Sequence, residues 1–115
     1  MTQNRNKLID IFIGNLVNSI VHTILEKAVK EDKDYLADKY RKELITSFEI
    51  AKRYRDKINP VNIPLPEKDI SFIKEKIIRR VKAELRIRIS RGYQGINLNE
   101  IDKEVNEALK KTNIS

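Results

Sequence analysis

The chain has 115 residues, of which 40% are hydrophobic and 36% are charged, and its formal net charge at pH 7 is +7. This length suits one helical domain with a single core, and we treat residues 1–115 as one unit. The absence of cysteine excludes disulfides, thiolate metal sites and cysteine nucleophiles.

The most apolar segment predicts a first helix from about Lys7 to Lys30. Its apolar residues cover an arc of roughly 260° when successive residues are placed 100° apart. A helix that is apolar over so much of its circumference is contacted from several sides, either at the centre of the fold or partly by another chain. A two-fold homodimer would bury part of this arc. The interface residues expected in that case are Ile9, Phe12, Ile13, Leu16 and Ile20.

A narrower apolar stripe predicts a second helix from about Asp34 to Ile58, with Asp32 or Asp34 capping its start. The segment Asn59–Pro66 follows and holds all three prolines. Proline lacks an amide donor and disfavours helical geometry in the residue before it, so this segment is expected to be an extended connector. Its alternating apolar residues leave open a lone edge strand.

The third helix is expected from Glu67 to about Ser90, and Gly92 is placed to end it in a left-handed conformation. Its expected inner face consists of Ile70, Ile73, Ile77, Val81, Leu85 and Ile89. After a short turn, Asn97 with Glu100 three residues later marks the start of a fourth helix, which should fray near Thr112. The expected fold class is therefore all-α, with three long helices and one shorter C-terminal helix.

The excess positive charge is concentrated on the third helix. Residues 74–91 hold eight basic and two acidic side chains, a net charge of +6. Most of the basic side chains project away from the inner face, and the last of them leads into a turn that carries a tyrosine. The candidate nucleic-acid-binding residues are Lys76, Arg79, Arg80, Lys82, Arg86, Arg91 and Tyr93.

A phosphate backbone is the usual partner of such a cationic surface, and Tyr93 would stack on an exposed base. Two other interpretations stay open. The arginines either pair with acidic groups of a neighbouring helix, such as Asp102 or Glu104, or bind an acidic protein surface. A helix-turn-helix is not indicated, because the last helix is slightly acidic and follows a very long helix.

The residue types needed for catalysis are scarce. The single histidine, His22, lies at the polar edge of the first helix and is expected to be a boundary residue rather than a base or ligand. One histidine without cysteine leaves a tetrahedral zinc site short of ligands, and three glycines form no phosphate-cradling loop. We therefore expect no enzymatic activity, no metal, no cofactor and no small-molecule substrate.

The apolar window from Leu8 to Leu25 is followed by no small-residue cleavage site, so a secretory signal is not expected. The same window contains four polar groups, Asp10, Asn15, Asn18 and His22. These groups disfavour a membrane-spanning helix, and a cytoplasmic location is expected. Attachment of the basic face to an anionic membrane is less favoured, because the basic helix lacks tryptophan.

Two functional hypotheses follow. The first is a non-enzymatic nucleic-acid-binding protein, or a small subunit of a nucleoprotein complex, that uses the basic third helix and the turn after it. The alternative is a homo-oligomeric helical interaction or scaffold protein that uses the apolar first helix, as a homodimer or as a subunit of a larger complex.

Overall fold

The computed structural model describes residues 5–29, 34–60 and 63–114. It contains α1 (Arg5–Val29), α2 (Asp34–Ile58), α3 (Glu67–Ser90) and α4 (Ile101–Lys111), with a short 3₁₀ turn, η1 (Leu98–Glu100), directly before α4. Three long helices and a shorter C-terminal one confirm the expected all-α class. Asp32 and the side chain of Asp34, which were expected to cap α2, lie outside the part of the chain that is described.

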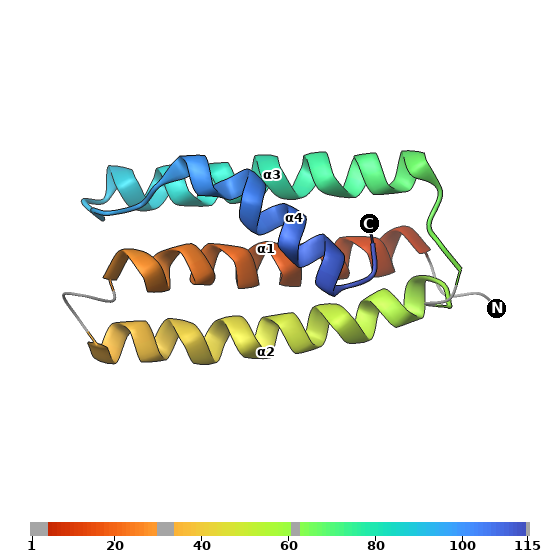
Figure 1. Ribbon diagram of the computed structural model, residues 1–115, viewed down its shortest axis with the longest axis horizontal. Coiled ribbons are helices and arrows are strands. Elements are labelled where there is room, and N and C mark those ends of the chain that lie inside the picture. The colour runs from red at the N-terminus through yellow and green to blue at the C-terminus, as the bar shows by residue number, and fades with distance from the viewer. Residues whose placement is uncertain (1–4, 30–33, 61–62, 115) are drawn as a thin grey trace.

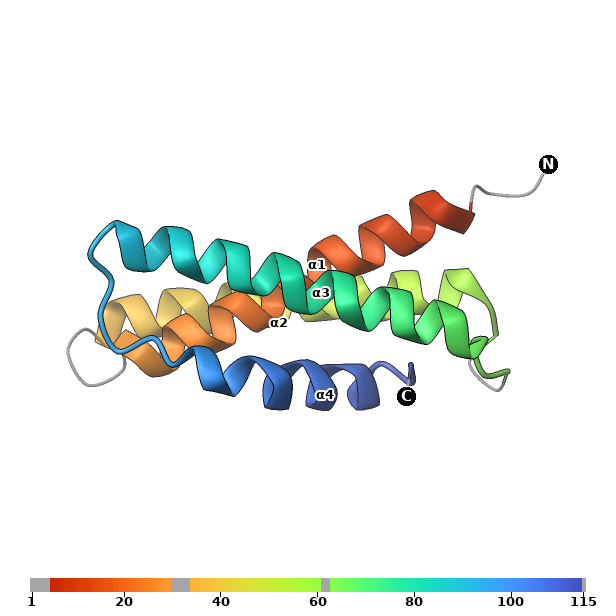
Figure 2. The same cartoon turned by 90° about the horizontal axis from the view of Figure 1, so that it is seen from above.

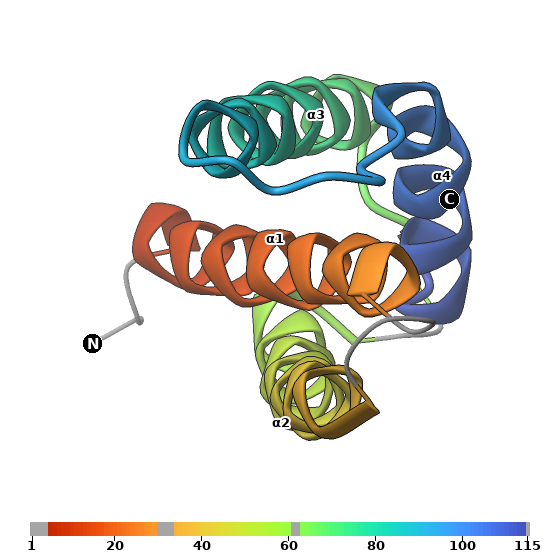
Figure 3. The ribbon, with the colours of Figure 1, turned by 90° about the vertical axis from the view of Figure 1, so that its left-hand side faces the viewer.

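The fold measures 48 × 23 × 22 Å, and the three long helices lie along its longest dimension (Figure 1). α1 lies between α2 and α3; α2 runs antiparallel to α1, and α3 runs in the same direction as α1. Seen from the end, α4 covers one side of this row (Figure 3). The basic helix α3 therefore lies at an edge of the molecule, with α1 beneath it and α4 on one flank.

The central position of α1 explains its wide apolar arc. Twelve of its 25 residues are buried, so it is contacted from several sides within its own chain. The expected interface residues have exposures of 5% or less, and they are Ile9, Phe12, Ile13, Leu16 and Ile20. This corrects their assignment to a surface for a second copy, because their side chains belong to the core of this chain.

α1 is also long and apolar enough, by length and composition alone, to cross a membrane. However, 67% of its most apolar window is buried inside the fold. The core helix of a folded domain has the same composition, so this property is weak support for a membrane span.

The connector between α2 and α3 packs one side chain into the core. Leu65 is 5% exposed, whereas Ile63 is 51% exposed. Ile63 N–H donates to the Pro60 carbonyl oxygen at 3.0 Å. The described residues of the connector form no strand, so the alternative of a lone edge strand is not realised in them.

Glycine ends α3 as expected. Gly92 has a φ of +96°, and Tyr93 N–H donates to the Arg88 carbonyl oxygen at 3.1 Å. This is the Schellman arrangement, in which a residue in the left-handed region lets the chain turn back and satisfies the last helical carbonyls. Gly95, with a φ of +81°, then passes close to the end of α1, where an added Cβ would lie 3.1 Å from the Ala28 carbonyl oxygen. The turn after α3 therefore lies against α1.

The cap before α4 acts one turn earlier than expected. The Asn97 side chain accepts a hydrogen bond from Asn99 N–H at 3.0 Å, so it caps η1 rather than α4 itself. α4 begins at Ile101, which is 1% exposed. The start signal in the sequence is used, with a 3₁₀ turn inserted between the cap and the helix.

α4 ends at Lys111, close to the expected Thr112, and the chain end that follows it is folded against the core. Asn113 adopts a φ of +59°, and Ile114 N–H donates to the Leu109 carbonyl oxygen at 2.9 Å. Ile114 itself is 3% exposed. A second Schellman motif, with asparagine at the left-handed position, thus folds the chain end back onto the core.

A buried arginine on α2 holds this chain end in place. Arg55 is 1% exposed, and its Nε and Nη2 donate to the Asn113 carbonyl oxygen at 3.2 and 3.1 Å. Its Nη1 donates to Asn59 Oδ1 at 2.7 Å and to the Asn59 carbonyl oxygen at 3.2 Å. Burial lowers the pKa of the guanidinium group. Arg55 therefore joins the end of α2 to the segment that follows α4.

Candidate nucleic-acid interface

α3 packs through one face only. Ile73, Ile77, Val81 and Leu85 are 0% exposed and contact the core. We call the cations on the remaining surface of α3 the basic face, and they are Lys76, Arg79, Arg80, Lys82 and Arg86. Lys76 is half-buried and the other four are exposed. The structure thus brings these five predicted residues together on a solvent-facing side of one helix.

Four cations of the basic face have no carboxylate partner in the described residues. The ion pairs found there include none of Arg79, Arg80, Lys82 and Arg86. Lys76 differs, because its Nζ lies 3.2 Å from Asp10 Oδ1 on α1. Among the described residues, the one ion pair of the basic face therefore lies at its N-terminal end.

The two acidic groups that were considered as partners for these arginines form no ion pair with them in the described residues. Glu104 Oε2 is 2.6 Å from Lys27 Nζ, and this hydrogen bond raises the pKa of Lys27. Asp102 is exposed and forms no ion pair with α3 in the described part of the chain. Internal pairing with α4 does not account for the arginines of α3.

Tyr93 is half-buried in the turn after α3 and makes contacts within the fold, so its expected role as a stacking platform stays a prediction. Its hydroxyl lies 3.1 Å from the Tyr40 hydroxyl and accepts a hydrogen bond from Arg88 Nη1 at 3.3 Å. The Arg88 guanidinium also lies 5.5 Å from the ring centroid of Tyr93. Arg91, by contrast, is exposed at the end of α3 and extends the basic surface.

The contact between the two tyrosines has a consequence at high pH. Burial, followed by the hydrogen bond to Tyr93, raises the pKa of Tyr40 to about 12. In the unfolded chain tyrosine ionises near pH 10. The stability that this contact contributes is therefore complete below about pH 10 and is lost as the pH rises through about 12.

We expect an ultraviolet titration of tyrosinate to show one group that ionises well above the others, and Tyr40→Phe to remove it. The free energy of unfolding of the Tyr40→Phe variant should also fall less steeply than that of the wild type above about pH 10. Tyr35→Phe is the matched control, because Tyr35 is 73% exposed. Identical titrations of wild type and Tyr40→Phe would contradict this prediction.

His22 is buried between α1 and α2 rather than lying at a polar boundary. It is 7% exposed, and its Nε2 lies 2.7 Å from Glu43 Oε2. Its Nδ1 lies 2.7 Å from the Asn18 carbonyl oxygen, and its ring centroid lies 5.5 Å from that of Tyr40. The ring therefore lies between two oxygen atoms, one from the backbone of α1 and one from a side chain of α2. These contacts join the two helices.

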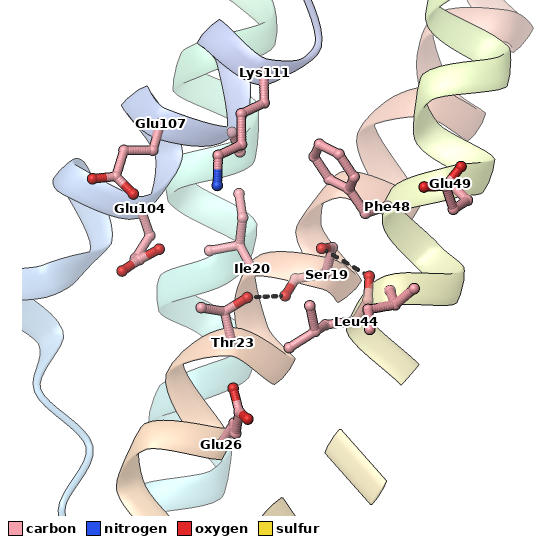
Figure 4. A pocket seen from close by; sticks show the side chains of 12 residues that line it. Ser19, Ile20, Thr23, Glu26, Leu44, Phe48, Glu49, Glu104, Glu107 and Lys111 are labelled. Atoms are coloured by element: carbon pink, nitrogen blue, oxygen red, sulfur yellow. Dashed lines mark hydrogen bonds between the residues drawn. The ribbon is translucent and has the colours of Figure 1, made fainter. Parts of the chain in front are cut away.

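A cavity of about 300 Å³ opens between α1, α2 and α4 (Figure 4). Two carboxylates that line it are held in ion pairs, Glu26 with Arg41 at 2.7 Å and Glu104 with Lys27. Its hydroxyl groups are also used, since Ser19 Oγ donates to the Leu44 carbonyl oxygen at 3.1 Å. A serine that donates to a carbonyl oxygen has no base to activate it. We find no pairing of nucleophile and base among the described residues of this cavity.

In residues 5–29, 34–60 and 63–114, no group of three or more His, Asp or Glu side chains is arranged to hold a metal ion. The surface feature that stands out is the basic face of α3.

Comparison with known proteins adds no further assignment. The chain matches no protein-family model, no curated protein and no solved structure. The interpretation of the basic face therefore depends on its own contacts, burial and charge.

Proposed function

We propose that this chain is a non-enzymatic nucleic-acid-binding protein, or a small subunit of a nucleoprotein complex, that binds the phosphate backbone through the basic face of α3. The observation that supports the proposal is that four neighbouring cations are exposed and have no carboxylate partner among the described residues. An unpaired guanidinium group presents several N–H donors in a fixed plane, which suits phosphate oxygens.

The spacing along the helix also supports the proposal. Arg79 and Arg86 are seven residues apart, which is two turns to within about 20° and a rise of about 10 Å. Arg80 and Lys82 lie on either side of the line that joins them, and Arg91 continues the charge at the end of the helix. This row of cations follows the edge of the fold, where a polymer of regularly spaced phosphates can lie along it.

The test is a salt titration of binding to DNA and RNA, followed by fluorescence anisotropy of a labelled strand. Four phosphate contacts predict a slope of log K against log salt of about −4 for duplex DNA and about −3 for a single strand. A flat dependence, or no binding at about 50 mM salt, would count against the proposal.

The alternative of a homo-oligomeric scaffold built on α1 has no comparable support. It was motivated by the wide apolar arc of α1, and that arc is covered within the chain, with Phe12, Ile13 and Leu16 at 0% exposure. We therefore prefer the basic face and the turn after it as the surface that binds a partner, because its cations are exposed.

A further inference from the structure

We infer that the basic face binds single-stranded nucleic acid, and that Phe72 is the side chain on which an unstacked base rests. This inference depends on the proposed function, because it specifies the class of nucleic acid that the same face takes. It starts from an aromatic ring that the fold leaves in solvent.

Phe72 lies in line with the arginines. It is 52% exposed, although phenylalanine is usually buried. It precedes Arg79 by seven residues and Arg86 by fourteen, so the three side chains lie along one side of α3 at intervals of about 10 Å. Lys76, one turn further along, holds its Nζ 5.5 Å from the ring centroid. An aromatic surface and a row of cations are thus continuous on one helix.

Phe72 also borders a cavity of about 570 Å³ between the start of α1 and the start of α3. Figure 2 shows that the first turns of α1 diverge from α3 in this region. The lining residues are Asn6, Ile9, Asp10, Lys68, Asp69, Phe72 and Lys76. A volume of this size lies within the range of sites that enclose small organic molecules. A base resting on Phe72 would enter this cavity, and its phosphates would lie beside Lys76 and Arg79.

The carboxylates of the cavity are compatible with a phosphate nearby, because each is paired with a cation. Asp10 Oδ1 lies 3.2 Å from Lys76 Nζ, and Asp69 Oδ2 lies 2.8 Å from Arg5 Nη2. Lys68 is exposed at the edge of the same cavity. The cavity therefore presents balanced charge inside and positive charge toward the basic face.

A single strand makes use of Phe72, whereas a duplex does not. In a duplex the bases are stacked on one another and are unavailable to a side chain outside the helix. Proteins that bind single strands combine a cationic track with aromatic rings on which bases stack. Tyr93 is engaged by Tyr40 and Arg88, which leaves Phe72 as the exposed aromatic ring on α3.

The chain contains no tryptophan, so Phe72→Trp introduces a single fluorescent reporter that keeps a stacking surface. We expect an oligothymidine of about 16 nucleotides to quench this fluorescence, and a duplex of the same length to leave it unchanged. Ile45→Trp is the control, since Ile45 is 52% exposed on α2 and borders the cavity between α1, α2 and α4, which no residue of α3 lines. Its fluorescence should not change with either nucleic acid.

Phe72→Ala should weaken binding of the oligothymidine by about 5- to 100-fold, and should leave the affinity for duplex and both salt slopes unchanged. Equal affinity of the wild type for single strand and duplex, with no effect of Phe72→Ala, would overturn this inference and leave the proposed function standing. No binding of either nucleic acid would overturn the proposed function itself. Binding of anionic phospholipid vesicles in place of both nucleic acids would do the same.

Discussion

Replacing Arg79, Arg80 and Arg86 together by glutamate is expected to lower the affinity for nucleic acid by about 1000-fold or more at about 50 mM salt. The reason is local charge. The substitutions change the net charge of residues 74–91 from +6 to zero. The variant therefore releases fewer counterions from the nucleic acid when it binds, and that release is what favours binding. Fluorescence anisotropy with a labelled strand measures the affinity, and circular dichroism measures the helix content.

The triple variant should keep the helix content and thermal midpoint of the wild type, because the three side chains are exposed and outside the ion pairs of the described residues. A charge-matched control is Lys39→Glu, Lys42→Glu and Arg53→Glu, which reverses three exposed cations of α2. Both triple variants have a net charge of +1, so only the location of the charge differs. Equal loss of binding in both would mean that the basic face of α3 has no special role.

Periodicity and turn residues predicted most of the fold. α2 and α3 have the expected bounds, because prolines precede α3 and Gly92 can adopt the positive φ that ends it. The end of α4 was harder to predict, because asparagine at the left-handed position is a weaker signal than glycine and the stabilising contact comes from Arg55, 58 residues away. Ile89 was assigned to the inner face of α3 but is 40% exposed, because each step of four residues turns the helix by about 40° beyond a full turn and carries Ile89 away from the buried stripe.

The position of the cations was predictable, but the roles of the aromatic residues were not. Five cations follow directly from the helical period, because residues opposite a buried stripe face solvent. The role of Tyr93 depends on Tyr40, which is 53 residues away in the sequence and is brought near only by packing. A signal for Phe72 was present, because it falls outside the inner-face spacing and precedes Arg79 by seven residues, which is two turns to within about 20°. The cavity beside Phe72, however, depends on how α1 crosses α3.

Arg55 likewise carried a signal, since it lies four residues after Ala51 and three before Ile58, on the apolar stripe of α2. We expect Arg55→Met to lower the free energy of unfolding by about 2–4 kcal/mol. Methionine fills a similar space but leaves the carbonyl oxygens of Asn59 and Asn113 without the donors that Arg55 supplies. The thermal midpoint should fall by about 10–20 °C. Chemical denaturation followed by circular dichroism measures this loss.

The effect of Arg55→Met should be greatest at the end of the chain. The amide of Ile114, which donates to the Leu109 carbonyl oxygen, should lose protection from hydrogen exchange before amides in the middle of α1 do. Arg55→Lys should lie between wild type and Arg55→Met, because one ammonium group cannot serve both Asn59 and Asn113. Arg53→Met, on the exposed side of the same helix, should change stability by no more than about 0.5 kcal/mol. If Arg55→Met were as stable as Arg53→Met, the contacts of the buried guanidinium group would not hold α4 to the core.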